Sequence, residues 1–269
     1  MLTILRVWLC ETPMHLFPLS LRRIILCLIL LLIAMLSKAF AGDSQIQPGQ
    51  YITKGGWGYL TVKQESVKQS SFDLVSVVDN GHTCLLDGEL QNNRSILETD
   101  EKDKPCIVDF RSVTEIVDSK YKNAVSVSAV SGNCFYFCGT RGYFDGTYLR
   151  VDPVCELEAR RRTQEEFKVL YKKKSYSEAY QKLEPLLSVC ADSLEWLQKG
   201  WIQNDLAITQ YKLGDLEECR RTLQTFTTDL AKTEENIREE YPPRDADAYI
   251  PILSAARFNL RLCNDKKKN

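Results

Sequence analysis

The chain has 269 residues, with 35 basic and 36 acidic side chains and a formal net charge of −1. Beyond Ala41 it keeps 31 basic and 35 acidic residues, a net charge of about −4. This mildly acidic balance lacks the basic surplus of general nucleic-acid binders, so no nucleic-acid partner is expected.

The first expected element is an export signal. Arg22 and Arg23 precede an apolar run over residues 24–36, and small residues at alternate positions before Gly42 fit a signal-peptidase site. The run is shorter than the about 20 residues that a membrane-spanning helix needs. Residues 1–41 are therefore predicted to be a signal peptide, with an uncleaved anchor as the alternative. After cleavage no membrane span is expected, and the protein is expected in the periplasm or outside the cell.

The cysteines beyond the leader form an even set: Cys84, Cys106, Cys134, Cys138, Cys155, Cys190, Cys219 and Cys263. An even set in an exported chain favours disulfide bonds. A zinc site formed by these cysteines is disfavoured, because His82 is the one histidine beyond the leader and no paired Cys-x-x-Cys spacing occurs. Neither a metal nor a cofactor is expected.

Residues 42–151 are predicted to form a β domain. Short apolar or alternating runs, at residues 58–63, 71–78, 106–110 and 125–130, are typical of strands, and turn formers such as Asp79, Asn80 and Gly81 separate them. Seven or eight short strands in roughly 100 residues favour a small antiparallel barrel or sandwich.

At Asp152 the apolar period changes to that of helices, so residues 152–265 are predicted to be all-α and the whole chain α+β. Expected helix starts are Asp152 with Pro153, Ser175 with Glu178, Asp192 or Ser193, and Asp215 with Glu218. Gly214 is expected to end the third helix, and a last helix is expected over residues 249–263. The basic tail, residues 266–269, is expected to be a solvated terminus or an anionic contact.

The helical half contains an internal repeat. A shift of forty residues places Tyr171 on Tyr211, Glu178 on Glu218 and Leu183 on Leu223. Each unit is then a helical hairpin that buries its apolar face by stacking on its neighbour. The stretch LAITQYKLGDLEECRRTLQ resembles a tetratricopeptide unit, although the period is longer and Cys219 stands where that family has alanine.

Of the eight cysteines beyond the leader, four lie on each side of Asp152, so each half can pair its own cysteines. Opposite ends of an antiparallel hairpin are neighbours, which favours Cys155 with Cys190, and the same argument brings Cys219 to Cys263. The β domain allows three pairings. Of these we expect Cys84 with Cys106, and Cys134 with Cys138.

The pair Cys134 and Cys138 flanks three aromatic residues and admits three interpretations. It can be a structural staple, a redox dithiol or half of a metal site. Redox dithiols usually lie at a helix start, where the helix dipole lowers a thiol pKa. The context here is strand-like, with Gly139, Gly142 and Gly146 marking turns, so the staple is favoured.

No catalytic residues are predicted, because His82 lies in a predicted surface turn and no phosphate loop or dinucleotide motif occurs. In the third helix, Asn204 and Asp205 beside Trp201 can line a groove between repeats or be a solvated face. The candidate binding surface is Trp201, Asn204, Asp205, Tyr211, Tyr143 and Tyr148.

The segments NGHTCLLDGEL, CIVDF and CFYFCGTRGYFDGTYLRVDPVC resemble the β domain of exported proteobacterial proteins described as lysozyme-inhibitor-like. WIQNDLAITQYKLGD and RFNLRLC are similar to the region that follows it in some of them. The resemblance implies a non-enzymatic binding protein of the cell envelope, with lysozyme or a peptidoglycan-related protein as partner. The alternatives are a periplasmic thiol oxidoreductase using Cys134 and Cys138, and a helical scaffold for another envelope protein.

Overall fold

The structure, a computed structural model, describes residues 45–66, 69–113, 123–139 and 141–265. The predicted signal peptide and the basic tail lie outside these residues. The described chain is an antiparallel sheet followed by a helical region, which confirms the α+β prediction. No helix in these ranges is long and apolar enough to cross a membrane.

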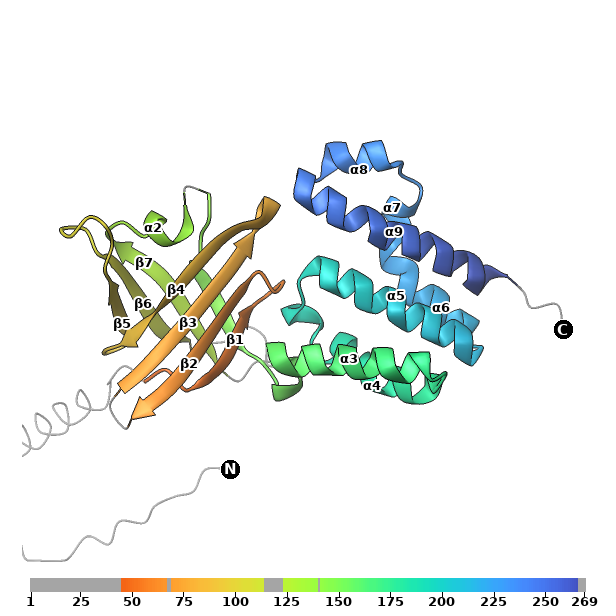
Figure 1. Cartoon of the computed structure of the whole chain (residues 1–269), viewed down its shortest axis with the longest axis horizontal. Coiled ribbons are helices and arrows are strands. Elements are labelled where there is room, and N and C mark those ends of the chain that lie inside the picture. Colours follow the sequence, from red (N-terminus) through yellow and green to blue (C-terminus); the bar gives the residue numbers. More distant parts are fainter. Residues whose placement is uncertain (1–44, 67–68, 114–122, 140, 266–269) are drawn as a thin grey trace, which may run out of the picture. The chain divides into compact units, whose positions relative to one another are not determined.

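The sheet has eight antiparallel strands in the order β4-β3-β2-β1-β8-β7-β6-β5 (Figure 1). Their bounds are β1 Gly49–Thr53, β2 Gly58–Ser66, β3 Gln69–Val78, β4 His82–Leu90, β5 Arg94–Leu97, β6 Cys106–Val113, β7 Ala124–Ser131 and β8 Gly146–Arg150. A short 3-10 turn, η1 (Asp79–Gly81), joins β3 to β4, where the sequence predicts a hairpin.

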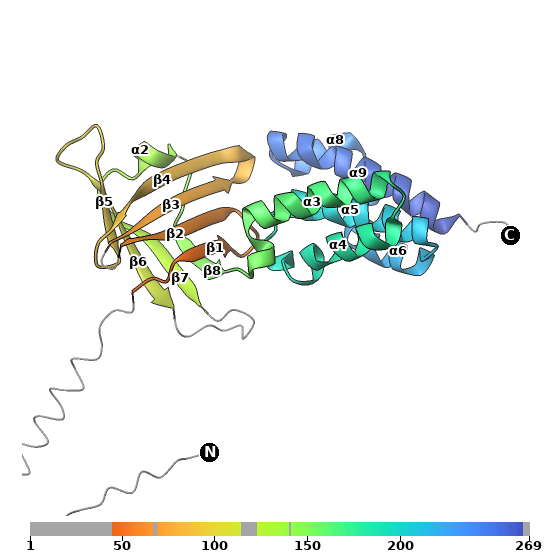
Figure 2. The ribbon, with the colours of Figure 1, turned by 60° about the horizontal axis from the view of Figure 1, so that its bottom comes forward.

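The sheet curls into a near-barrel around one core (Figure 2). Buried and exposed side chains alternate along β3, as expected for a strand with one face turned to the interior. The end strands β4 and β5 meet at a tight turn, where Gln91 and Arg94 exchange backbone hydrogen bonds of 2.9 and 3.1 Å. Phe72 and Phe110, from β3 and β6, pack with ring centroids 4.8 Å apart across the core.

One short helix, α2 (Phe135–Cys138), precedes β8, where the sequence suggests a strand-like segment. The helices that follow the sheet are α3 Leu157–Lys172, α4 Tyr176–Ser188, α5 Trp196–Leu213, α6 Leu216–Leu223, α7 Thr227–Leu230, α8 Glu234–Glu240 and α9 Pro243–Asn264. Three short 3-10 turns belong to this region: η2 (Pro153–Cys155) before α3, η3 (Ala191–Ser193) between α4 and α5, and η4 (Gln224–Phe226) between α6 and α7.

Two expected helix starts are wrong in detail. Asp152 caps the 3-10 turn η2, so α3 begins only at Leu157, and α5 is capped by Glu195 instead of Asp192 or Ser193. Ser175 is the N-cap residue of α4 as expected, although its side chain makes no capping hydrogen bond. The Glu195 carboxylate accepts hydrogen bonds from the backbone amides of Leu197 and Gln198, at 3.0 and 3.1 Å. The last helix begins at Pro243, earlier than expected, because proline is well suited to the first helical position.

The forty-residue repeat is visible in the backbone. Lys174 N bonds to Tyr171 O and Ser175 N to Leu170 O after α3; after α5, Gly214 N bonds to Tyr211 O and Asp215 N to Gln210 O. Lys174 and Gly214 both have positive φ, 62° and 84°. The first hairpin, α3 with α4, and the second, α5 with α6, therefore end their first helices with the same cap.

The repeat also governs the helical core. Ala179, Leu183 and Leu186 of the first hairpin are completely buried, and Cys219, Leu223 and Phe226 are buried at the corresponding positions of the second. Disulfides join Cys155 to Cys190 and Cys219 to Cys263, which confirms both pairings predicted for this half.

Candidate binding cleft

A cleft of about 600 Å³ lies where the sheet and the helices meet. The sheet contributes the turn between β1 and β2, the end of β3, η1 and the loop before β8. The helical half contributes the first turns of α5 and α9. Its aromatic lining is Trp57, Tyr59, Tyr143 and Trp196.

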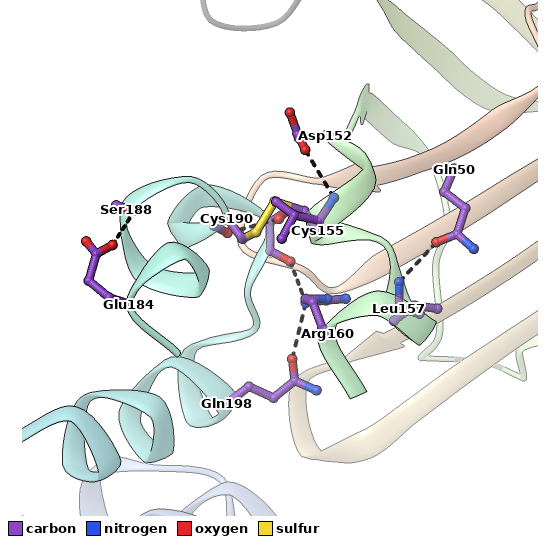
Figure 3. Close-up of a disulfide and its surroundings, with 11 residues drawn as sticks. Gln50, Asp152, Cys155, Leu157, Arg160, Glu184, Ser188, Cys190 and Gln198 are labelled. Atoms are coloured by element: carbon purple, nitrogen blue, oxygen red, sulfur yellow. Dashed lines mark hydrogen bonds between the residues drawn. A yellow bond between two sulfur atoms is a disulfide. The ribbon is translucent and has the colours of Figure 1, made fainter. Parts of the chain in front are cut away.

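Hydrogen bonds and a close backbone approach fix the two walls of this cleft. Gly55 N donates to Asp192 O at 2.7 Å. Leu157 N donates to the Gln50 side-chain oxygen Oε1 at 3.1 Å (Figure 3). Gly56 has φ +67°, and a Cβ added there would lie 2.4 Å from Glu195 N. Only glycine permits this approach, because the two backbones are in direct contact.

The sheet wall carries an aromatic cluster built on Trp57. The Trp57 ring packs against Tyr143 at 5.2 Å and against Tyr148 at 6.2 Å between ring centroids. Gly146, which the sequence marks as a turn, lies beneath the indole, since an added Cβ would be 3.1 Å from Trp57 Cη2. The small residue thus makes room for the tryptophan.

The helix wall carries a second aromatic cluster, built on Trp196. Its ring stacks on Tyr241 with centroids 5.5 Å apart, and Tyr249 meets it edge-on at 4.8 Å. Both tyrosine hydroxyls donate to Asp229 Oδ2, at 3.3 and 2.9 Å. Burial, and then the neighbouring Asp229 carboxylate, raise the pKa of Tyr249 well above its ordinary value. The tyrosines therefore remain protonated donors that hold Trp196 in place.

Behind the cleft lies a buried cation, Arg160 of α3. Its Nη1 atom donates to Gln198 Oε1 at 3.4 Å (Figure 3) and to Ser193 O at 3.3 Å. Its guanidinium lies 5.7 Å from the centre of the Tyr59 ring. Nε and Nη2 have no hydrogen-bond partner among the described residues. Since Tyr59 and Gln198 line the cleft, this positive charge lies directly behind its wall.

Two residues of the candidate surface lie inside the fold, so their assignment to a binding surface is wrong. Tyr148 is fully buried and donates to Phe144 O at 2.7 Å. Asn204 is 3% exposed and joins α5 to α9, because it donates to Ile252 O and accepts from Asn259 Nδ2. A buried amide is stable only when such partners satisfy it.

The other candidates do not form one surface. Tyr143 is 50% exposed and lines the cleft, whereas Trp201, 44% exposed, lies on α5 and does not line it. Tyr211 and Asp205 are half-buried. Burial raises the pKa of Asp205 to about 6, and the Lys168 ammonium opposes part of that rise.

The sheet cysteines pair differently from the prediction. Cys84 is bonded to Cys138, and Cys106 to Cys134. Because residues four apart share one face of a helix, α2 points both cysteines toward the sheet. Cys138 therefore links α2 covalently to β4, and Cys134 links it to β6. The two cysteines are not joined to each other, as they would be in an oxidised redox dithiol.

Trp57, Tyr59 and Trp196 were absent from the predicted surface. The glycines around Trp57, at positions 55, 56 and 58, signal a close backbone approach, but no local pattern indicates which segment approaches. No group of three or more His, Cys, Asp or Glu suited to a metal ion occurs in the described part of the chain.

Comparison with known proteins found no matching family model, no similar curated protein and no similar solved structure.

Proposed function

We propose that the protein is an exported, non-enzymatic binding protein of the bacterial cell envelope, and that the cleft is its recognition site. The observation that carries the proposal is the pairing of two braced aromatic clusters across one cavity. Binding sites are typically concave and largely apolar, with a few polar groups placed among the apolar ones.

The proposed location, the periplasm or the exterior, rests on covalent chemistry. The four disulfides use all eight cysteines beyond the leader. Bonds of this kind persist in oxidising compartments. They support a structural role for the sulfurs over a thiol oxidoreductase.

Two matched tryptophans test the cleft. Trp196 and Trp201 lie on the same helix with similar exposure, 41% and 44%, and only Trp196 lines the cavity. The wild-type mature protein and its Trp196→Ala and Trp201→Ala variants would be immobilised and exposed to envelope extract. A component retained by wild type and Trp201→Ala but lost by Trp196→Ala supports the proposal. Equal retention by all three baits contradicts it.

Lysozyme inhibition is the sharpest form of the proposal and comes from the sequence resemblance. The mature protein is then expected to slow lysozyme on isolated cell walls in proportion to its concentration. An unchanged lysis rate at micromolar protein excludes lysozyme as the partner, and the cleft must then bind a different ligand.

A tetratricopeptide-like scaffold is a second candidate, favoured by exposed apolar side chains on the helices. Trp201 on α5 and Phe258 on α9 are 44% and 52% exposed. Exposed aromatics of this size are enriched at protein interfaces. A partner lost by Trp201→Ala but kept by Trp196→Ala in the same capture experiment indicates the scaffold.

A further inference from the structure

We infer that the ligand of the cleft is a short, uncharged oligosaccharide. This inference rests on the proposed function, because it takes the cleft as the recognition site, and it adds the chemical class of the ligand. Three properties of the cavity lead to it: aromatic side chains lining it from both the sheet and the helices, polar groups in the same lining, and a near balance of charge.

The aromatic walls suit a ring-shaped ligand with apolar faces. Trp57 with Tyr143 line one wall and Trp196 lines the other. Tyr241 and Tyr249 brace Trp196 from behind, so its orientation does not have to be fixed on binding. A pyranose ring presents C–H groups on its faces, which pack against aromatic rings, whose faces carry partial negative charge.

The polar lining suits hydroxyl groups. Asp79, Gln198 and Arg244 line the same cavity and bring carboxylate, carboxamide and guanidinium groups to it. These groups include acceptors as well as donors, so together they can bond to hydroxyls, which both donate and accept. A purely apolar ligand would strip water from these groups, which costs binding free energy even though Arg244 Nη1 already donates to Gly81 O and Gln198 Oε1 already accepts from Arg160 Nη1.

The charges near the cavity favour a neutral ligand. Asp79, Glu195 and Asp245 line it together with Arg244, and Arg160 lies behind Tyr59 and Gln198. The Glu195 carboxylate is already bonded to the first turn of α5. Neither sign of charge therefore dominates enough to select a strongly charged ligand.

The volume of the cavity also suits a short oligosaccharide. It is about 600 Å³, within the range of about 300 to 1,000 Å³ that is usual for small-ligand sites.

Tryptophan fluorescence gives a direct test. Beyond the leader the chain has Trp57, Trp196 and Trp201, and the first two line the cleft. The mature protein would be titrated with three neutral trisaccharides: cellotriose, maltotriose and tri-N-acetylchitotriose. We expect a saturable emission change with at least one of them. Trp196→Ala should weaken that binding at least tenfold, and Trp201→Ala should leave it within twofold.

Tyr143→Ala is a second cleft variant, which keeps the test valid if Trp196→Ala misfolds. Tyr143 is a half-exposed loop side chain on the opposite wall, so its removal should leave the fold intact. It should also weaken binding at least tenfold while the circular dichroism spectrum is unchanged. No saturable change with any trisaccharide at 10 mM, or equal weakening by Trp196→Ala and Trp201→Ala, overturns the inference. Tighter binding of phosphate or tetramethylammonium than of sugar overturns it too. If capture from extract still depends on Trp196, the proposed function survives and only the sugar class is wrong.

Discussion

At the scale of single residues, Asp205 shows what burial does to a carboxyl group. It lies on α5 near Lys168 and Tyr171 of α3, and burial raises its pKa to about 6. An unfolded aspartate has a pKa of about 3.9. Between about pH 4 and pH 6 the folded chain therefore keeps a proton that the unfolded chain loses, and the free energy of unfolding falls as the pH rises.

Replacing this carboxyl group by an amide should remove the pH dependence. We expect Asp205→Asn to be about 1 to 2 kcal/mol more stable than wild type at pH 7.5 and nearly equal to it at pH 4. Urea unfolding followed by circular dichroism measures both. Asp103→Asn, at an exposed loop position, is the control and should differ from wild type by less than about 0.5 kcal/mol. A variant that gains no stability at pH 7.5 contradicts the assigned burial.

At the scale of elements, the two helical hairpins end their first helices with different residues in the same left-handed backbone conformation. Lys174 ends α3 at φ 62°, where the second hairpin has Gly214 at φ 84°. A side chain in the left-handed region costs about 1 to 2 kcal/mol. We therefore expect Lys174→Gly to raise the free energy of unfolding by about 0.5 to 1 kcal/mol after the entropy gained by the unfolded chain is subtracted.

The reciprocal variant is the matched control for that prediction. Gly214→Lys should lower the free energy of unfolding by about 1 kcal/mol, since a Cβ at this position meets no atom within 4 Å and only the backbone conformation is strained. Urea unfolding of both variants measures the pair. Opposite signs at the two sites are the expected result, and a loss of stability in both would show that the caps are not equivalent.

The position of α2 determines which cysteines of the sheet region form disulfide bonds with each other. Digestion of the unreduced chain from Gly42 onward and mass spectrometry should yield peptides joining Cys84 to Cys138 and Cys106 to Cys134. A peptide joining Cys84 to Cys106, or Cys134 cross-linked to Cys138, contradicts the structure. Removing the first pair as Cys84→Ser with Cys138→Ser should cost about 4 kcal/mol, since that bond closes the longer loop, and removing the second about 3.5 kcal/mol.

At the scale of the whole described chain, the two halves are held together by backbone contact at a glycine turn. Gly55 and Gly56 both have positive φ, but an added Cβ at Gly55 lies 3.9 Å from its nearest neighbour and one at Gly56 overlaps Glu195 N. We expect Gly55→Ala to lose about 1 kcal/mol from backbone strain alone. Gly56→Ala should lose about 3 kcal/mol or more, because overlap adds to the strain.

Urea unfolding measures this difference, and tryptophan fluorescence, to which the cleft residues Trp57 and Trp196 contribute, shows whether the cleft is disturbed with it. Gly56→Ala should shift the emission, and Gly55→Ala should not. Equal losses from the two variants would show that close packing at Gly56 does not hold the halves together.

The sequence by itself determined the features that depend on neighbouring residues. The change of period at Asp152, the α+β class, the Gly214 stop and the Asp215 cap of α6 were all predicted, because each depends on residues within a few positions. The assignment of four cysteines to each half was also predicted, and so were both bridges of the helical half, since hairpin geometry follows from the same local pattern.

Only the tertiary structure decided the features that join distant segments. The sheet disulfides depend on α2 turning both of its cysteines toward β4 and β6, against the strand-like appearance of the segment. The burial of Tyr148 and Asn204 depends on which face of each element the rest of the chain covers. The cleft brings Trp57, Tyr143 and Trp196 together from three separate segments. Local periodicity contains no information on such contacts, because they are fixed by the packing of whole elements against one another.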